Sequence, residues 1–121
     1  MVETWAFDGR TAPVTADEAI AELRGRIAGG ELESWLTSSS GRLLAVVTNT
    51  ERAMVMLLDG DGDPGVCAAD PGAGGVSDGF VLANGQVDSY PDEDTVPLAE
   101  AFRIVRHLIA RGTPPPGVTW K

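Results

Sequence analysis

Apolar and polar positions follow two rhythms along this chain, one typical of helices and one of strands. Apolar residues recur every three or four positions over residues 16–27 and again over 98–109, which predicts two amphipathic helices. Thr15 and Glu18 have the spacing of a capping box at the start of the first helix. Gly112 follows the second stripe and is typical of a helix end.

Short apolar runs separated by turn residues predict strands in the rest of the chain. The run Ala53–Leu58 holds six apolar residues in a row. A strand with no polar side lies centrally in a sheet that is covered on one face and at least partly sheltered on the other. Asn84-Gly85 between two further runs predicts a hairpin. The predicted strands are 3–7, 33–38, 43–48, 53–58, 66–68, 80–83, 86–90 and 118–120.

The order of these elements predicts one domain, residues 1–121, of the α+β class. We expect an antiparallel meander sheet of about six or seven strands, with the two amphipathic helices packed on one face. No apolar run approaches the roughly 18 residues that a membrane span needs. The first ten residues lack the basic start and apolar core of a secretion signal, and Cys67 is the single cysteine. These features predict a cytoplasmic protein without a disulfide.

The distribution of charge says more about possible partners than the composition does. The net charge is −9, and the fifty residues between Arg52 and Arg103 contain ten acids and no Lys, Arg or His. Such a segment repels nucleic acid and anionic membranes and attracts a basic surface. Solubility alone is the other interpretation of the same charge.

Candidate catalytic groups are few. His107 falls on the helix side opposite the apolar stripe, without a predicted partner, and the glycine-rich residues 70–75 carry no lysine for phosphate. Acids in solvated loops do not gain the raised pKa that acid–base catalysis needs. We therefore predict no enzymatic activity, no cofactor and no catalytic or metal-ligating residue.

The most specific motif in the sequence is a partial match to a calcium-binding loop. Asp59, Asp61 and Asp63 occupy positions 1, 3 and 5 of such a loop, and Asp70 occupies position 12. Pro64 stands at position 6, where the calcium loop needs glycine, and a predicted strand precedes the motif. An acidic inter-strand loop is the preferred interpretation, and weak calcium binding is the alternative.

The C-terminal third resembles a known family. The run Val96–Phe102, its continuation to Gly112 and the closing Pro116–Trp120 are similar to the C-terminal signature of immunity protein family one, which accompanies bacterial polymorphic toxins. In that family a helix opened by Val-Pro ends at glycine, a proline follows, and the chain closes on a tryptophan. The resemblance spans roughly residues 33–121 and includes Trp35, Asp78-Gly79-Phe80, Asn84-Gly85-Gln86 and Tyr90-Pro91.

The resemblance implies a cytoplasmic antidote that binds a cognate toxin, usually a deaminase, and blocks its active site. The charge pattern agrees, because an enzyme acting on nucleic acid presents a basic groove that an acidic protein can occupy. Nucleic acid and membrane are not expected partners. An accessory or chaperone-like binding module for a secreted protein is the alternative, and a small calcium-responsive domain is a third. The expected partner-binding residues are Asp59, Asp61, Asp63, Asp78, Asp88, Tyr90, Asp92 and Glu93.

Overall fold

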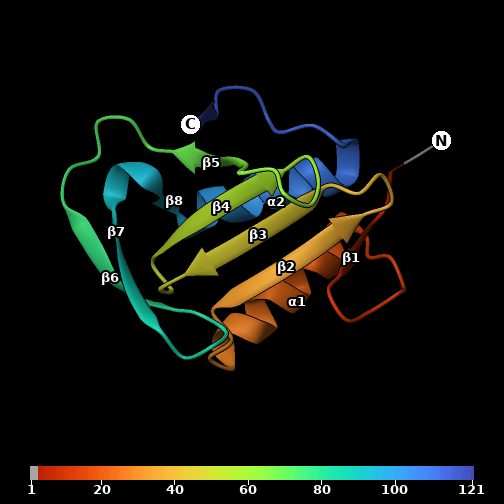
Figure 1. Ribbon diagram of the computed structural model, residues 1–121, viewed down its shortest axis with the longest axis horizontal. Coiled ribbons are helices and arrows are strands. Elements are labelled where there is room, and N and C mark those ends of the chain that lie inside the picture. Colours follow the sequence, from red (N-terminus) through yellow and green to blue (C-terminus); the bar gives the residue numbers. More distant parts are fainter. Residues whose placement is uncertain (1–2) are drawn as a thin grey trace.

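Both predicted helices form and lie on the same face of a sheet in the computed structural model, which describes residues 3–121 (Figure 1). Helix α1 spans Ala16–Ala28 and α2 spans Leu98–Arg111. The capping box is confirmed: the Thr15 hydroxyl accepts from the Glu18 backbone N–H at 3.1 Å, and the Glu18 carboxylate accepts from the Thr15 backbone N–H at 2.8 Å. Gly112 ends α2 with a φ of 78°, a left-handed conformation that suits glycine.

The main sheet has seven strands in the order β1-β2-β3-β4-β5-β9, with β8 beside the start of β4. Every neighbouring pair is antiparallel. β4 pairs with β3 along nearly its whole length, with β8 at its start and with β5 near its end, which confirms its expected central place. The strands are β1 (Trp5–Phe7), β2 (Glu33–Ser38), β3 (Leu43–Thr48), β4 (Arg52–Leu58), β5 (Val66–Ala69), β8 (Val96–Pro97) and β9 (Thr119–Trp120).

The hairpin predicted at Asn84-Gly85 forms, but it stands apart from the main sheet. Its strands, β6 (Val76–Val81) and β7 (Val87–Pro91), make a separate two-stranded sheet and lead through a 3₁₀ turn, η1 (Asp92–Asp94), into β8. The pairing register shifts between Ser77 and Phe80, around Gly79 with its φ of 83°. A bulge of this kind bends a hairpin, so the meander does not continue flat through these strands.

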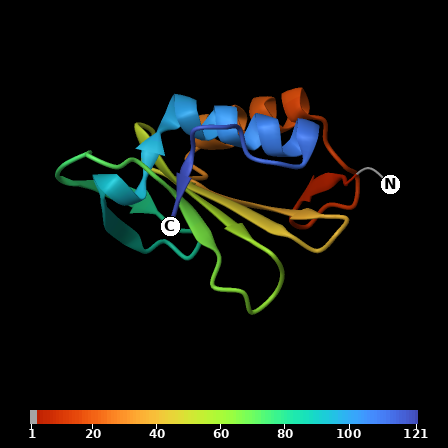
Figure 2. The same ribbon diagram turned by 90° about the horizontal axis from the view of Figure 1, so that it is seen from above.

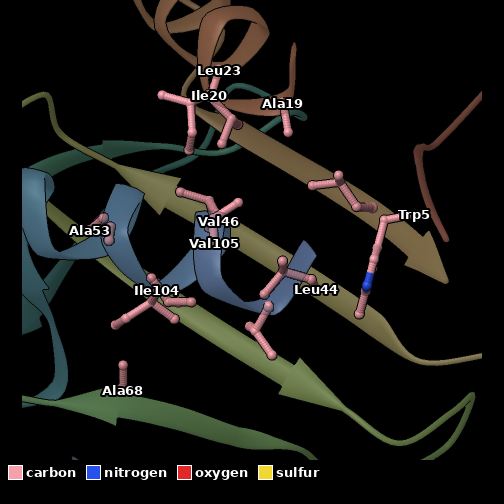
Figure 3. Packing of buried hydrophobic residues seen from close by; sticks show 14 of the residues in the cluster. Trp5, Ala19, Ile20, Leu23, Leu44, Val46, Ala53, Ala68, Ile104 and Val105 are labelled. Atoms are coloured by element: carbon pink, nitrogen blue, oxygen red, sulfur yellow. The ribbon is translucent and has the colours of Figure 1, made fainter. Parts of the chain in front are cut away.

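One core fills the space between the helices and the sheet. Figure 3 shows side chains of α1, α2 and the strands meeting there, with Trp5 at one end and Ala53 and Ala68 at the other. Alternate residues of each strand point into this core and the residues between them point to the opposite side. The largest fully buried members of the core are Trp5, Phe7, Leu23, Leu36, Leu44, Ile104 and Leu108.

An arginine clamp closes the Trp5 end of the core. The Arg42 guanidinium donates to both carboxylate oxygens of Glu3 and, at 2.8 Å, to the carbonyl of Gly112 at the end of α2. It also lies over the Trp5 ring, 5.3 Å from its centroid. This one side chain therefore joins the N-terminal segment, the start of β3 and the end of α2.

Trp120 is half-buried and packs against the core, where β9 pairs with β5. We expect Trp120→Ala to lower the free energy of unfolding by about 2–3 kcal/mol, below the loss for a fully buried aromatic because part of the ring is accessible. The thermal midpoint should fall by about 10 °C. Circular dichroism during heating measures it. An unchanged midpoint would mean that Trp120 contributes nothing to the core.

Glu3 makes stability depend on pH. Hydrogen bonds from Arg42, with smaller ones from Ser40 and Ser38, lower the pKa of Glu3 to about 2, against the opposing effect of burial. Because this folded-state pKa is depressed, the stabilisation is complete above the ordinary value of 4.5 and is lost as pH falls towards 2. Glu3→Gln should therefore cost about 1–2 kcal/mol at neutral pH and flatten the acid limb of the stability curve. Urea unfolding at several pH values tests this, with Asp17→Asn as the exposed control, and parallel curves for E3Q and the parent would contradict it.

Candidate partner-binding face

The helices cover one face of the main sheet, and the β6–β7 hairpin lies over only part of the other. Leu44 and Val46 of β3 and Val55 of β4 point towards the helices and belong to the core. Strand alternation therefore directs Ala45 of β3 and Met54 of β4 to the other side, which we call the open face. Figure 2 shows the helices on one side of the sheet, with only the β6–β7 hairpin and the β4–β5 loop on the other.

The centre of the open face is apolar. Strand pairing places Trp35 of β2, Ala45 of β3, Met56 of β4 and Cys67 of β5 in one row across the sheet. Ala45 is fully buried between its neighbours, whereas the other three side chains are half-buried. Further half-buried apolar side chains on this face are Leu43, Met54 and Leu58.

The Cys67 thiol belongs to this apolar surface. Cys67 is free and half-buried. Burial raises the pKa of the thiol, and the nearby Asp94 carboxylate adds to the effect while Lys121 opposes it. The thiol is thus neutral at physiological pH and acts as a small apolar side chain.

Acids gather at two places beside this apolar centre. The β4–β5 loop carries Asp59, Asp61 and Asp63 and projects from the open side of the sheet (Figure 2). Within the described residues, the carboxylate of Asp63 accepts from the Asp59 backbone N–H at 2.8 Å, whereas the carboxylates of Asp59 and Asp61 have no bonded partner. The structure therefore places these three predicted residues together and leaves two of them free for solvent or a partner.

The hairpin brings the second acidic group to the other side. Tyr90 stacks edge-on against the fully buried Phe80, with ring centroids 4.9 Å apart, and its hydroxyl donates to Asp88 at 3.0 Å. Burial raises the pKa of Tyr90 to about 12, and the hydrogen bond to Asp88 and the charge of Glu33 act in the same direction. The phenol therefore stays neutral beside two carboxylates. Asp78 lies exposed on β6 near Asn49.

Glu33 joins the hairpin to the open face, although sequence reasoning did not single it out. One of its carboxylate oxygens accepts from the Trp35 indole N–H at 2.8 Å, and the other accepts from the Ala83 backbone N–H at 3.0 Å. A hollow of about 310 Å³ adjoins it. Leu32 and Leu82 give this hollow apolar walls, and Glu31 and Glu33 supply charge. Such a lining suits the aliphatic stem and charged end of a lysine or arginine.

Asp92 and Glu93 are placed differently from the other predicted residues. Asp92 accepts from the Ser77 hydroxyl at 2.5 Å and faces Arg52, while Glu93 lies 3.9 Å from the Lys121 ammonium. Both carboxylates are thus partly neutralised within the molecule. Asp78, Asp88 and Glu33 form no ion pair within residues 3–121, and Asp78 among them is exposed.

Arg52 joins several parts of the acidic segment to the start of β4. Its guanidinium donates at 2.7 Å to both the Asp70 carboxylate and the Thr95 hydroxyl, and it also reaches the backbone carbonyls of Asp92 and Thr95. The side chain is only 18% exposed. Because it ties β4 to the end of β5, to η1 and to β8, it positions the hairpin that these elements flank.

The remaining candidates for chemistry stay apart from this face. Over residues 3–121, no three His, Cys, Asp or Glu side chains lie together in a group that could hold a metal ion. Asp70, which would close the calcium loop, is bound by Arg52. His107 contacts the carbonyl of Thr113 just beyond the end of α2, with 2.5 Å between Nδ1 and the oxygen. In the described part of the chain, no helix is long and apolar enough to cross a membrane.

The apolar residues of the open face were visible in the sequence only as strand residues. Met54, Met56 and Leu58 lie in the six-residue apolar run, and that run indicated a strand covered on one side and at least partly sheltered on the other. The pattern did not say which face the helices would cover. Comparison with protein-family models finds none that matches this chain, and a search of curated proteins finds no similar sequence.

Loss of the Arg52 contacts should loosen the acidic segment. We expect Arg52→Gln to lower the free energy of unfolding by about 2–3 kcal/mol, because it leaves Asp70 and several oxygens without their donor. Urea unfolding measures the change. Arg103→Gln is the matched control, since Arg103 is 50% exposed and, within residues 3–121, pairs only with Glu100; it should change stability far less than Arg52→Gln, because solvent screens an exposed ion pair. Equal effects of the two variants would contradict a special role for Arg52.

Proposed function

We propose that this protein is an antidote that binds a basic cognate toxin and covers its active site. The observation that carries the proposal is an apolar sheet face that no helix covers, with acids on two sides of it. A protein surface of this kind fits a protein partner, because interface centres are apolar and their rims are polar. The resemblance to immunity protein family one supports the same function and suggests a cytoplasmic protein paired with a deaminase-type toxin.

The distribution of ion pairs supports a basic partner. Arg52 and Lys121, two cations that contact the acidic segment, are already engaged by Asp70, Asp92 and Asp94. The acids of the β4–β5 loop and of the hairpin therefore keep their negative charge. Complementary charge speeds the encounter of two proteins, towards about 10⁸ M⁻¹s⁻¹ at low salt. An active-site groove that binds nucleic acid is basic and would be attracted in this way.

The gene next to this one should encode the toxin, and two measurements test the proposal. Co-expression of this protein should protect cells from the purified or induced toxin domain. Asp59→Asn together with Asp61→Asn should slow association about 3- to 10-fold at low salt, measured by stopped flow, because the two carboxylates steer the encounter. The effect should shrink at physiological salt, where charges are screened beyond about 8 Å. A second pair, Asp78→Asn with Asp88→Asn, tests the hairpin side.

The matched control removes two negative charges from the helix layer, with Asp17→Asn and Glu100→Gln. It should change the association rate by less than either open-face pair. A toxin that kills cells despite co-expression would refute the antidote function. If the association rate changes neither with salt nor in any of the three double variants, the interface lies on another surface.

A further inference from the structure

We propose that the open face is the anchor of the interface and receives a basic, amphipathic segment of the partner. Apolar side chains of that segment pack on Trp35, Met54 and Met56, while its lysines and arginines reach the β4–β5 loop and the hairpin. The inference rests on the proposed function for the partner's identity, but the chemistry of the segment follows from the face itself. According to this proposal, uncharged side chains of the open face supply most of the affinity for the partner.

Strand addition is a poor way to bind this sheet, because its edges are closed or short. The outer edge of β1 is covered by Val14, whose backbone N–H donates to the Trp5 carbonyl at 2.8 Å. The other edge strand, β9, has two residues. A partner that seeks the main sheet therefore meets its face and not its edge.

A second copy of this chain is also a poor occupant. Each copy carries a net charge of −9, and a face-to-face pair would bring the acids of both β4–β5 loops and both hairpins together. Like charges opposed across an interface are destabilising. A segment with lysine or arginine on both sides of an apolar stripe matches the pattern of the open face instead.

The open face is too small to form the whole interface with a partner. Strands β2 to β5 span about 14 Å, and β4 runs about 13 Å from Met54 to Leu58. This area is well below the roughly 800 Å² that each partner contributes to a standard interface. The apolar centre can thus hold one segment, and the loop and hairpin must supply the rest of the contact. In such interfaces a few central residues carry most of the affinity.

The methionines provide reporters for the test. Of the chain's three methionines, Met54 and Met56 lie on the open face. The probes are a Leu/Lys peptide with helical spacing of leucines and a Gln/Lys peptide of equal length with the same lysines. With ¹³C-methyl methionine labelling, we expect the Leu/Lys peptide to shift both methyl signals and to bind about tenfold more tightly than the Gln/Lys peptide.

Met56→Glu separates packing from charge. The substitution adds a carboxylate, so binding by charge alone predicts tighter binding, whereas packing on the open face predicts about a tenfold loss for the Leu/Lys peptide. Val87→Glu is the matched control, because Val87 is 63% exposed on the hairpin and gains the same charge away from the face; it should not weaken binding. Met56→Gln keeps the size and charge of the side chain and should also weaken binding, which guards against a misfolded M56E.

Equal affinity for the two peptides, or tighter binding by M56E, would overturn the inference. So would methyl signals of Met54 and Met56 that stay in place when the Leu/Lys peptide binds. Failure of the proposed function is distinct, because it appears as a toxin that is not neutralised while the peptides still bind as expected. Conversely, a toxin neutralised and bound equally well by M56E and by the parent refutes this inference alone.

Discussion

Two helices cover one face of a seven-stranded sheet, and that constraint governs the rest of the molecule. The helices bury the residues of β2, β3 and β4 that point towards them. The apolar stripes of both helices are buried in the same core, so neither helix has a second apolar side to cover another surface. The hairpin that remains is bent out of the sheet by the bulge at Gly79, so it shelters only part of the opposite face. The central strand therefore carries apolar residues on both sides: Ala53 and Val55 are fully buried against the helices, whereas Met54 and Met56 on the other side are half-buried.

Two arginines fix the ends of this arrangement. Arg42 joins Glu3, Trp5 and the end of α2, while Arg52 joins β4 to the acidic segment. Each makes several hydrogen bonds from one guanidinium, a fork geometry that lysine cannot reproduce. The chain has twice as many acids as bases, and these two cations are engaged in hydrogen bonds and ion pairs within the molecule. The consequence is that the outward-facing charge near the hairpin and the β4–β5 loop is negative.

In the proposed complex, charge and packing have different tasks. Exposed carboxylates on mobile side chains act over a distance and mainly change how fast a basic partner arrives. Apolar side chains act only on contact and mainly change how slowly it leaves. The open face holds both in a small area, and Glu33 links them because it accepts hydrogen bonds from Trp35 and from the hairpin.

The sequence alone determined the elements and the class of the fold. Helical spacing, the Thr15 capping box and Gly112 located both helices, and the apolar run of β4 indicated a central strand, because these signals act between residues close in the chain. Only the tertiary structure decided which acids face outward. Asp92 and Asp70 meet Arg52 through folding, whereas Asp59 and Asp61 form no ion pair within residues 3–121, and local sequence does not distinguish them. The open face is likewise a product of packing, since strand alternation creates two faces and the direction in which both helices fold back selects the one left uncovered.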